Sequence, residues 1–193
     1  MTGNLRRPAL LAMAVFIAGL SAATPNAFAA PGRAPSTTDS QANALAAAVR
    51  RQAAAHPAAA RHICYAAHVE NIGWQQPVCD GAVAGTTGQG LRLEALDIVV
   101  SQVGGVCAAA HVEGLGWGPV TCAGENTTVA VGTVGRGLRL EALHINVNSG
   151  TVCANAHVEN IGWQGVSCAS APSFALAGTT GRGLRMEAIQ LTV

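Results

Sequence analysis

The sequence predicts an all-β domain built from three tandem repeats that close with pseudo-threefold symmetry. The first observation is that two motifs recur three times from residue 62 onward, with a period of 43 and then 46 residues. The second is that each repeat alternates apolar with small or polar residues between glycine-rich connections, which is typical of strands joined by turns. No repeat is large enough to bury a core alone. We therefore expect the three to surround one axis, preferably as a β-prism and alternatively as a β-trefoil.

The two motifs define the repeats. The first is Cys-x-x-Ala-His-Val-Glu-x-x-Gly-Trp, and the second is Gly-x-Gly-Leu-Arg-x-Glu-Ala. They place the repeats at residues 62–103, 104–149 and 150–193. Within the first repeat, residues 64–70 and 91–100 are the predicted strands. If the second strand is regular, Arg92 and Glu94 share a face with Leu96 and Ile98, so that a charged pair lies at the head of an apolar stripe.

Residues 1–30 are predicted to be a signal peptide, which implies a secreted, extracellular protein. Arg6 and Arg7 precede the apolar stretch Leu10–Leu20, and Ala27-Phe28-Ala29 has the small-x-small pattern of a cleavage site. The apolar stretch is shorter than the roughly 20 residues that a bilayer requires, so no membrane span is expected.

Residues 31–61 are predicted to be an Ala-rich linker or pro-segment. Residues 41–55 favour a short helix, because Ala has the highest helix propensity, and Pro57 ends it. Few apolar residues larger than Ala occur here, so we expect this helix to have nothing to bury.

The charge of the chain argues against a nucleic-acid partner. There is no Lys, and residues 62–193 contain 5 Arg against 9 acidic residues. A clustered basic surface, which nucleic-acid binding requires, is therefore not expected.

Six cysteines follow the repeat, with two in each unit at a separation of 15 residues. Three identical units favour one structural disulfide within each, and an exported chain meets an oxidising compartment. The spacing is not that of the short Cys-x-x-Cys of zinc or redox sites. The predicted pairs are Cys64–Cys79, Cys107–Cys122 and Cys153–Cys168.

One Trp occurs in each repeat at the same motif position, namely Trp74, Trp117 and Trp163. Such a Trp either packs in the core or presents its ring face to the C–H face of a sugar. The neighbouring Arg and Glu form a satisfied pair at the core rim, or the Glu accepts hydrogen bonds from a polar ligand while the Arg holds it. The remaining candidate ligand-binding residues are Glu94, Glu141, Glu187, His68, His111, His157, Asn71, Asn160, Arg92, Arg139 and Arg185.

Neither a metal site nor an active site is expected. Nothing in the sequence places the three motif histidines near the symmetry axis, so we assign no metal and no cofactor. Hydrolase, metalloprotease and nucleotide-binding motifs are missing. Because an enzyme needs one asymmetric site, three near-identical units favour three equivalent binding sites and no catalysis.

These units resemble the clostridial hydrophobic W repeat family. The resemblance rests on Ala-His-Val-Glu-Asn-Ile-Gly-Trp-Gln at 67–75 and 156–164, and on Ala-Gly-Thr-Thr-Gly-x-Gly-Leu-Arg-x-Glu-Ala at 84–95 and 177–188. They also look like the tandem W–E domain lectins of actinomycetes, hemagglutinins that bind L-rhamnose and D-galactose. This resemblance implies a secreted trivalent lectin for cell-surface or cell-wall glycans, with the motif Trp and Glu as the named pair in each unit.

The alternative function is an extracellular adhesion or cell-wall scaffold module that binds protein or wall polymer. The second repeat departs from the others, since Gly114, Gly118 and Val134 replace Asn, Gln and Thr. If those side chains contact ligand, the second site is weaker.

Overall fold

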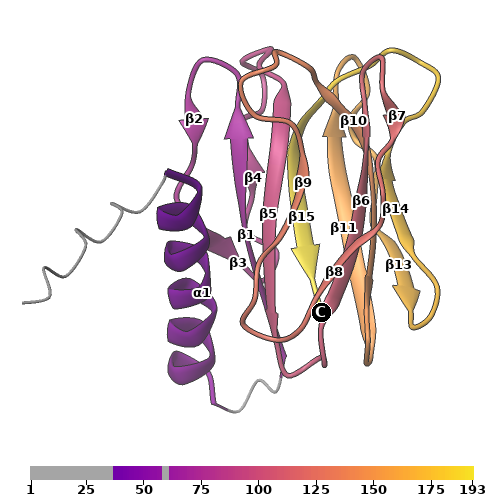
Figure 1. The fold of residues 1–193 in the computed structure, drawn as a ribbon. Coiled ribbons are helices and arrows are strands. Elements are labelled where there is room, and N and C mark those ends of the chain that lie inside the picture. Colours follow the sequence, from indigo (N-terminus) through magenta and orange to yellow (C-terminus); the bar gives the residue numbers. More distant parts are fainter. Residues whose placement is uncertain (1–36, 58–60) are drawn as a thin grey trace, which may run out of the picture. The chain divides into compact units, whose positions relative to one another are not determined.

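The computed structural model describes residues 37–57 and 61–193, as one helix and 15 strands (Figure 1). The predicted signal peptide lies outside the described residues. Helix α1 spans Thr37–Ala55, and no described helix is both long and apolar enough to cross a bilayer.

Each repeat contributes five strands in the same order. In the first repeat they are β1 (His62–Val69), β2 (Gly73–Trp74), β3 (Val78–Cys79), β4 (Ala84–Gly85) and β5 (Leu93–Ser101). In the second they are β6 (Val106–Val112), β7 (Gly116–Trp117), β8 (Thr121–Ala123), β9 (Val129–Gly132) and β10 (Leu140–Val147). In the third they are β11 (Thr151–Val158), β12 (Gly162–Trp163), β13 (Ser167–Ser170), β14 (Ala175–Gly178) and β15 (Met186–Thr192).

Every sheet is completed by a strand from another repeat. The first sheet has the order β2-β1-β5-β9, and β9 belongs to the second repeat. The second has the order β14-β10-β6-β7, with β14 from the third repeat, and the third has the order β12-β11-β15-β4, with β4 from the first. All pairings are antiparallel, and β3, β8 and β13 pair separately with β1, β6 and β11. Strands β4, β9 and β14 are thus exchanged between repeats. This strand exchange is cyclic and links each repeat to the other two.

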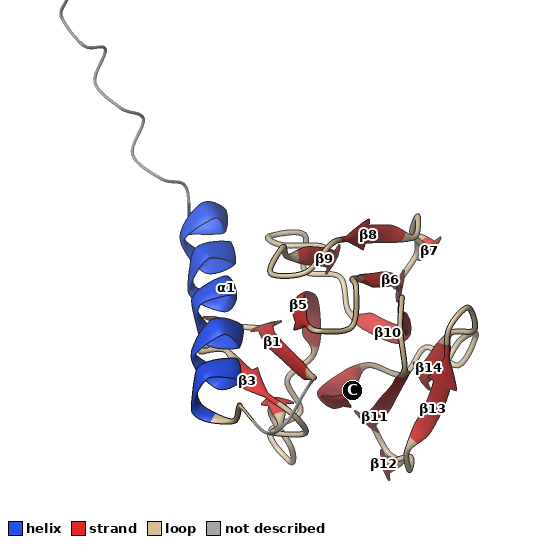
Figure 2. Cartoon of the chain, turned by 90° about the horizontal axis from the view of Figure 1, so that it is seen from below, coloured by secondary structure: helices blue, strands red, loops and turns tan. Residues whose placement is uncertain are grey.

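The three sheets surround one shared core (Figure 2). Strand residues alternate between this core and the outer face of each sheet, as the period of a strand requires. Ile63, Tyr65 and Ala67 of β1 point inward, whereas Cys64 and Ala66 lie on the outer face. The predicted all-β fold of three repeats with threefold closure is confirmed, and three separate sheets around one core correspond to the preferred β-prism.

Tyr65 breaks the threefold repetition of the core, because Ala108 and Ala154 occupy its equivalent positions. Its hydroxyl donates to the carbonyl of Ala82 and accepts the backbone N–H of Leu191 at 2.9 Å. Burial raises the pKa of Tyr65 to about 12, so the hydroxyl stays neutral. This side chain adds a polar link between the first and third repeats inside the core.

The three predicted disulfides are confirmed. They join Cys64 to Cys79, Cys107 to Cys122 and Cys153 to Cys168. Each pair lies directly opposite in the antiparallel ladder between the first and third strands of its repeat. The bonds therefore close the same loop in each unit.

The expectation that the N-terminal helix has nothing to bury is wrong. Helix α1 begins at Thr37, earlier than predicted, and packs on the outer face of the first sheet. Leu45 and Val49 are fully buried, four residues apart on one side of the helix, and Ala48 beside them is buried. Cys64, Ala66 and Val99 form the receiving surface. The two larger side chains, Leu45 and Val49, are enough to dock the helix, because the surface that receives them is itself small and apolar.

Replacing Leu45 by Ala tests whether this packing stabilises the domain. We expect Leu45→Ala to lower the free energy of unfolding by about 2–4 kcal/mol, because it leaves a cavity in a fully buried contact. Arg50→Ala, at an exposed position of the same helix, is the matched control and should change it by less than about 0.5 kcal/mol. Denaturant unfolding followed by Trp fluorescence measures both, and equal effects of the two variants would contradict the packing.

Asp97 gives the first sheet a pH-dependent stability. Its carboxyl group is buried on the outer face of β5, opposite Ala66, and burial raises the pKa of Asp97 to about 6. The folded state then binds the proton more tightly than the unfolded state. The stability associated with this group is present below about pH 4 and is lost as the pH rises to about 6.

We expect Asp97→Asn to remove that loss. Between pH 3.5 and pH 7 the stability of the wild type relative to Asp97→Asn should fall by up to about 3 kcal/mol, which corresponds to the raised pKa. Urea unfolding at several pH values measures the difference. Parallel stability profiles of the two proteins would show that the carboxyl group titrates normally.

Candidate functional site

A β-bulge in each long strand positions the motif glutamate. In the pairing of β1 with β5, His68 lies opposite Ala95 and Val69 lies opposite Leu93, so Glu94 is an extra residue. The same irregularity occurs at Glu141 and at Glu187 in the other repeats. The condition under which Arg92 and Glu94 would share a face with Leu96, a regular strand, is therefore not met. Leu93, and not Glu94, continues the core stripe of Leu96, and Glu94 is held beside His68 on the outer side.

Arg92 holds the bulged carboxylate in the first repeat. Its Nε and Nη2 atoms donate to Oε1 of Glu94 at 3.1 and 2.9 Å, and its Nη1 pairs with Glu70 in the turn after β1. The side chain of Glu94 is 7% exposed, whereas Arg92 and Glu70 are both 24% exposed. The predicted Arg–Glu pair is therefore present, with the buried carboxylate at its base and the guanidinium and a second carboxylate at the surface.

The other repeats reproduce this ion-pair chain. In the second repeat, Nη2 of Arg139 lies 3.0 Å from Oε1 of Glu141, and its Nη1 pairs with Glu113 at 2.5 Å. In the third repeat, Nε of Arg185 donates to Oε1 of Glu187 at 3.0 Å, and its Nη1 pairs with Glu159 at 2.5 Å.

The motif histidine connects the tryptophan to the buried glutamate. Nδ1 of His68 lies 3.1 Å from Oε2 of Glu94, without the alignment of a hydrogen bond. This contact becomes an ion pair when the ring is protonated. The ring also meets Trp74 edge to face, with centroids 5.4 Å apart. The corresponding His–Glu separations are 3.0 Å for His111 and 3.2 Å for His157, and these rings meet Trp117 and Trp163 at 5.4 and 5.3 Å.

The three tryptophans lie at the surface to different degrees. Trp117 is 40% exposed and Trp163 is 39% exposed, so neither is a core residue. Trp74 is partly buried, because it packs against the cluster under helix α1. Trp117 also stacks on His144, with ring centroids 4.0 Å apart and an interplanar angle of 16°. The expectation of a core tryptophan is therefore wrong for the second and third repeats, and stacking on a sugar stays a prediction.

Each cluster is completed by the following repeat in the exchange. The backbone N–H of Thr133 donates to the carbonyl of Glu94 at 2.8 Å, next to Gly132 at the end of β9. The glycine loop that follows brings Gly137 beside Arg92, with a Cβ at Gly137 3.5 Å from Nη2. Equivalent bonds join Thr179 to Glu141 at 2.8 Å and Thr86 to Glu187 at 2.9 Å. The candidate sites therefore lie at junctions between repeats.

A turn conformation accounts for the predicted residues Asn71 and Asn160. Their φ angles are 61° and 60°, and Gly114 at the equivalent position of the second repeat has a φ of 69°. Asn and Gly are the residues that most readily adopt this left-handed conformation. The left-handed backbone conformation thus explains why Gly replaces Asn in the second repeat. This position does not belong to the cluster of His, Trp, Glu and Arg.

Two sets of residues in the clusters are not among the ligand-binding residues predicted from the sequence. One is the outer carboxylate, which is Glu70, Glu113 or Glu159, and the other is the threonine next to the glycine at the end of the exchanged strand, which is Thr86, Thr133 or Thr179. The sequence signal for the outer carboxylate is that Glu ends the motif His-Val-Glu in every repeat. The second had no local signal, because its partner belongs to another repeat.

The histidines do not converge on the symmetry axis. Each lies on the outer face of its own sheet. In the first repeat, His68 continues the outward-facing series of Cys64 and Ala66 along β1. Within residues 37–57 and 61–193, no group of three or more His, Cys, Asp or Glu side chains has an arrangement that holds a metal ion.

A comparison with protein families identifies these repeats. The family model described as clostridial hydrophobic W matches residues 68–102, 111–149 and 157–193. The chain belongs to the clostridial hydrophobic W family. Each match begins at the histidine of a cluster and includes its Trp, Arg and both Glu residues, so the hydrophobic W repeat contains most of the candidate site. No curated protein and no solved structure matches the chain. The predicted relation to W–E domain lectins stays a prediction.

The glycine at the end of each exchanged strand permits the junction between hydrophobic W repeats. A Cβ at Gly178 would lie 2.3 Å from the carbonyl oxygen of Glu141, closer than atoms can approach. We expect Gly178→Ala to lower the free energy of unfolding by about 2–5 kcal/mol, because it adds overpacking to an unfavourable φ of 96°.

Gly181→Ala is the control for the backbone conformation alone. Gly181 has a φ of 68° and no atom within 4 Å of an added Cβ, so the expected loss is only about 1–2 kcal/mol. Chemical denaturation measures both variants. Equal losses would mean that the close contact at Gly178 does not hold the repeats together.

Proposed function

We propose that this protein is a secreted, trivalent, non-enzymatic lectin with one carbohydrate site per repeat. The observation that supports this most directly is a Trp ring beside a polar cluster at each junction, which is 40% exposed for Trp117, 39% exposed for Trp163 and partly buried for Trp74. An aromatic ring provides an apolar plate for a sugar ring, and polar groups at its edge orient the hydroxyls. A binding site for a small polar ring needs both features together.

The polar residues divide into two roles under this proposal. The surface groups Arg92 and Glu70, with their equivalents, offer donors and acceptors to sugar hydroxyls. Charged partners make stronger hydrogen bonds than neutral ones. Glu94 is almost buried and already bonded to Arg92, so it acts as a positioning residue that fixes the guanidinium and the histidine. Its equivalents Glu141 and Glu187 have the same role.

Three sites on three separate sheets favour binding to surfaces that display many glycans. A second and third contact then occur within the same encounter, which raises the overall affinity by effective concentration. Cell-surface and cell-wall glycans present such arrays. The three disulfides suit the oxidising conditions of an extracellular protein.

The proposed ligands are L-rhamnose and D-galactose. This assignment rests on the resemblance of the repeats to W–E domain lectins. Rhamnose also fits the site chemically, because a deoxy sugar has a methyl group that adds apolar contact with an aromatic plate.

Titration calorimetry with each monosaccharide tests the proposal, using the wild type and Trp163→Ala. We expect three sites in the wild type and two in the variant, with unfolding free energies within about 1 kcal/mol of each other, because Trp163 is 39% exposed. Replacing all three tryptophans should abolish red-cell agglutination.

Val83→Ala is the matched control, since Val83 is exposed but belongs to none of the three clusters. It should bind as the wild type does. An unchanged number of sites in a folded Trp163→Ala protein, or a glycan array without signal, would reject the lectin proposal.

A second candidate is an adhesion or cell-wall scaffold module that binds protein or wall polymer. The observation that favours it is an exposed aliphatic residue two positions before each Trp, namely Ile72, Leu115 and Ile161, which are 51%, 52% and 40% exposed. The apolar surface of the Trp and this aliphatic residue together is larger than the binding of a monosaccharide requires. Binding to isolated cell walls that free sugars do not inhibit would select this function.

A further inference from the structure

The first and third repeats each use a glutamine side chain to bind the end of a strand. Oε1 of Gln75 accepts the backbone N–H of Gly85 at 2.7 Å, and its Nε2 donates to the carbonyl of the same residue at 3.2 Å. Oε1 of Gln164 accepts the N–H of Gly178 at 2.8 Å. A primary carboxamide is therefore the group that this backbone position binds inside the protein.

The second repeat has the same backbone without that side chain. The N–H of Gly118 donates to the carbonyl of Ala110 at 2.9 Å, as the N–H of Gln75 does to Ala67 at 2.9 Å. The backbone at residue 118 therefore has the same hydrogen bond as at Gln75, but the residue is glycine and has no side chain. Gly132, the equivalent of Gly85, is exposed, whereas Gly85 and Gly178 are partly covered.

The polar backbone groups of Gly132 face away from the sheet. Gly132 is paired with Ala95 of β5, and the bond across the strands comes from Thr133, whose N–H donates to Glu94 at 2.8 Å. The Gly132–Ala95 pair is therefore a non-hydrogen-bonded pair of the antiparallel ladder. Its N–H and C=O point to the opposite side, where Gln75 meets Gly85 in the first repeat.

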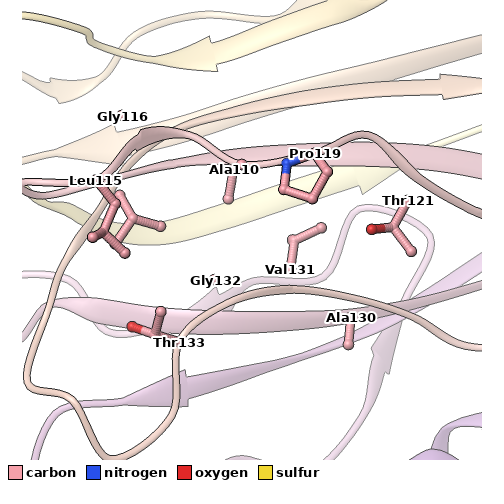
Figure 3. Close-up of a pocket in the computed structure, with 11 residues that line it drawn as sticks. Ala110, Leu115, Gly116, Pro119, Thr121, Ala130, Val131, Gly132 and Thr133 are labelled. Carbon is pink, nitrogen blue, oxygen red and sulfur yellow. The ribbon is translucent and has the colours of Figure 1, made fainter.

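A cavity of about 270 Å³ lies on that side (Figure 3). Gly118 and Gly132 line it together with apolar atoms of Ala110, Leu115 and Pro119. In the first and third repeats a glutamine side chain reaches across the equivalent space. The cavity thus combines an apolar wall for a short alkyl chain with one backbone donor and one backbone acceptor.

We propose that this cavity is a binding site for a primary carboxamide, supplied by a glutamine side chain of a partner peptide. The carbonyl of the carboxamide accepts the N–H of Gly132, and its NH₂ group donates to the C=O of Gly132, as Gln75 does at Gly85. A secondary amide in the trans form has its N–H opposite its carbonyl, so it cannot make both bonds to one residue. A carboxylate has no donor. The site therefore selects glutamine over glutamate.

The test uses the ¹⁵N-labelled full chain and the acetylated tripeptides Gly-Gln-Gly and Gly-Glu-Gly. We expect the Gln peptide to shift the amide resonances of Gly132 and Gly118, with at least tenfold weaker binding of the Glu peptide. The amides of Gly85 and Gly178 should not move, because their own glutamines already bind them. This internal comparison separates the site from general peptide binding.

Gly118→Gln should abolish the shifts, since it restores the arrangement of the other repeats. The substitution is sterically allowed, because the only atom near a Cβ at this position is the carbonyl oxygen of Ala110 at 3.6 Å. Gly118→Ala is the matched control and should still bind the peptide.

Binding that survives Gly118→Gln, or equal binding of the Gln and Glu peptides, would overturn the proposal. Propionamide distinguishes the source of the carboxamide. Weaker binding of propionamide than of the tripeptide supports a peptide partner, and equal binding overturns that assignment. The lectin proposal is unaffected by either result, because Trp117 does not line this cavity.

Discussion

The rest of the structure depends on the close contact between the glycine that ends each exchanged strand and the bulged glutamate of another repeat. At this contact the backbone of one repeat lies so near the other that no side chain fits, and the following threonine N–H bonds to the glutamate carbonyl. The contact adds a strand to each sheet and closes the ring of three repeats. It also brings a glycine loop beside the Arg of the neighbouring cluster. Fold closure and site assembly are therefore consequences of the same constraint.

The same constraint fixes the chemistry of the clusters. A bulge turns the glutamate out of the core stripe, where Arg and His surround its carboxylate and the Trp lies beyond the His. A buried carboxylate is stable only with such partners. The polar part of each cluster is thus rigid and preorganised, and the exposed Trp rings of the second and third repeats lie next to it. Preorganised groups lose little conformational entropy when they bind a ligand.

The three repeats are alike in sequence but have different surroundings. Helix α1 covers the outer face of the first sheet, and Trp74 packs against the apolar cluster between them. In the second repeat His144 stacks on Trp117, and Gly118 leaves a cavity where the others have a glutamine. The third repeat has neither of these features. Threefold repetition of the motif therefore provides a common site, and a few substitutions outside it give each copy a distinct surface.

The sequence by itself determined the all-β fold of three repeats, the disulfide pairs and the His, Trp, Glu and Arg that gather in each cluster. These follow from local spacing, which repetition makes visible three times. The tertiary structure alone decided the bulge at Glu94, the docking of Leu45 and Val49, the strand exchange and the role of Asn71 as a turn residue. The physical reason is that register and packing depend on partners distant in the chain. One inserted residue reverses which side chains face the core, and no local pattern records it.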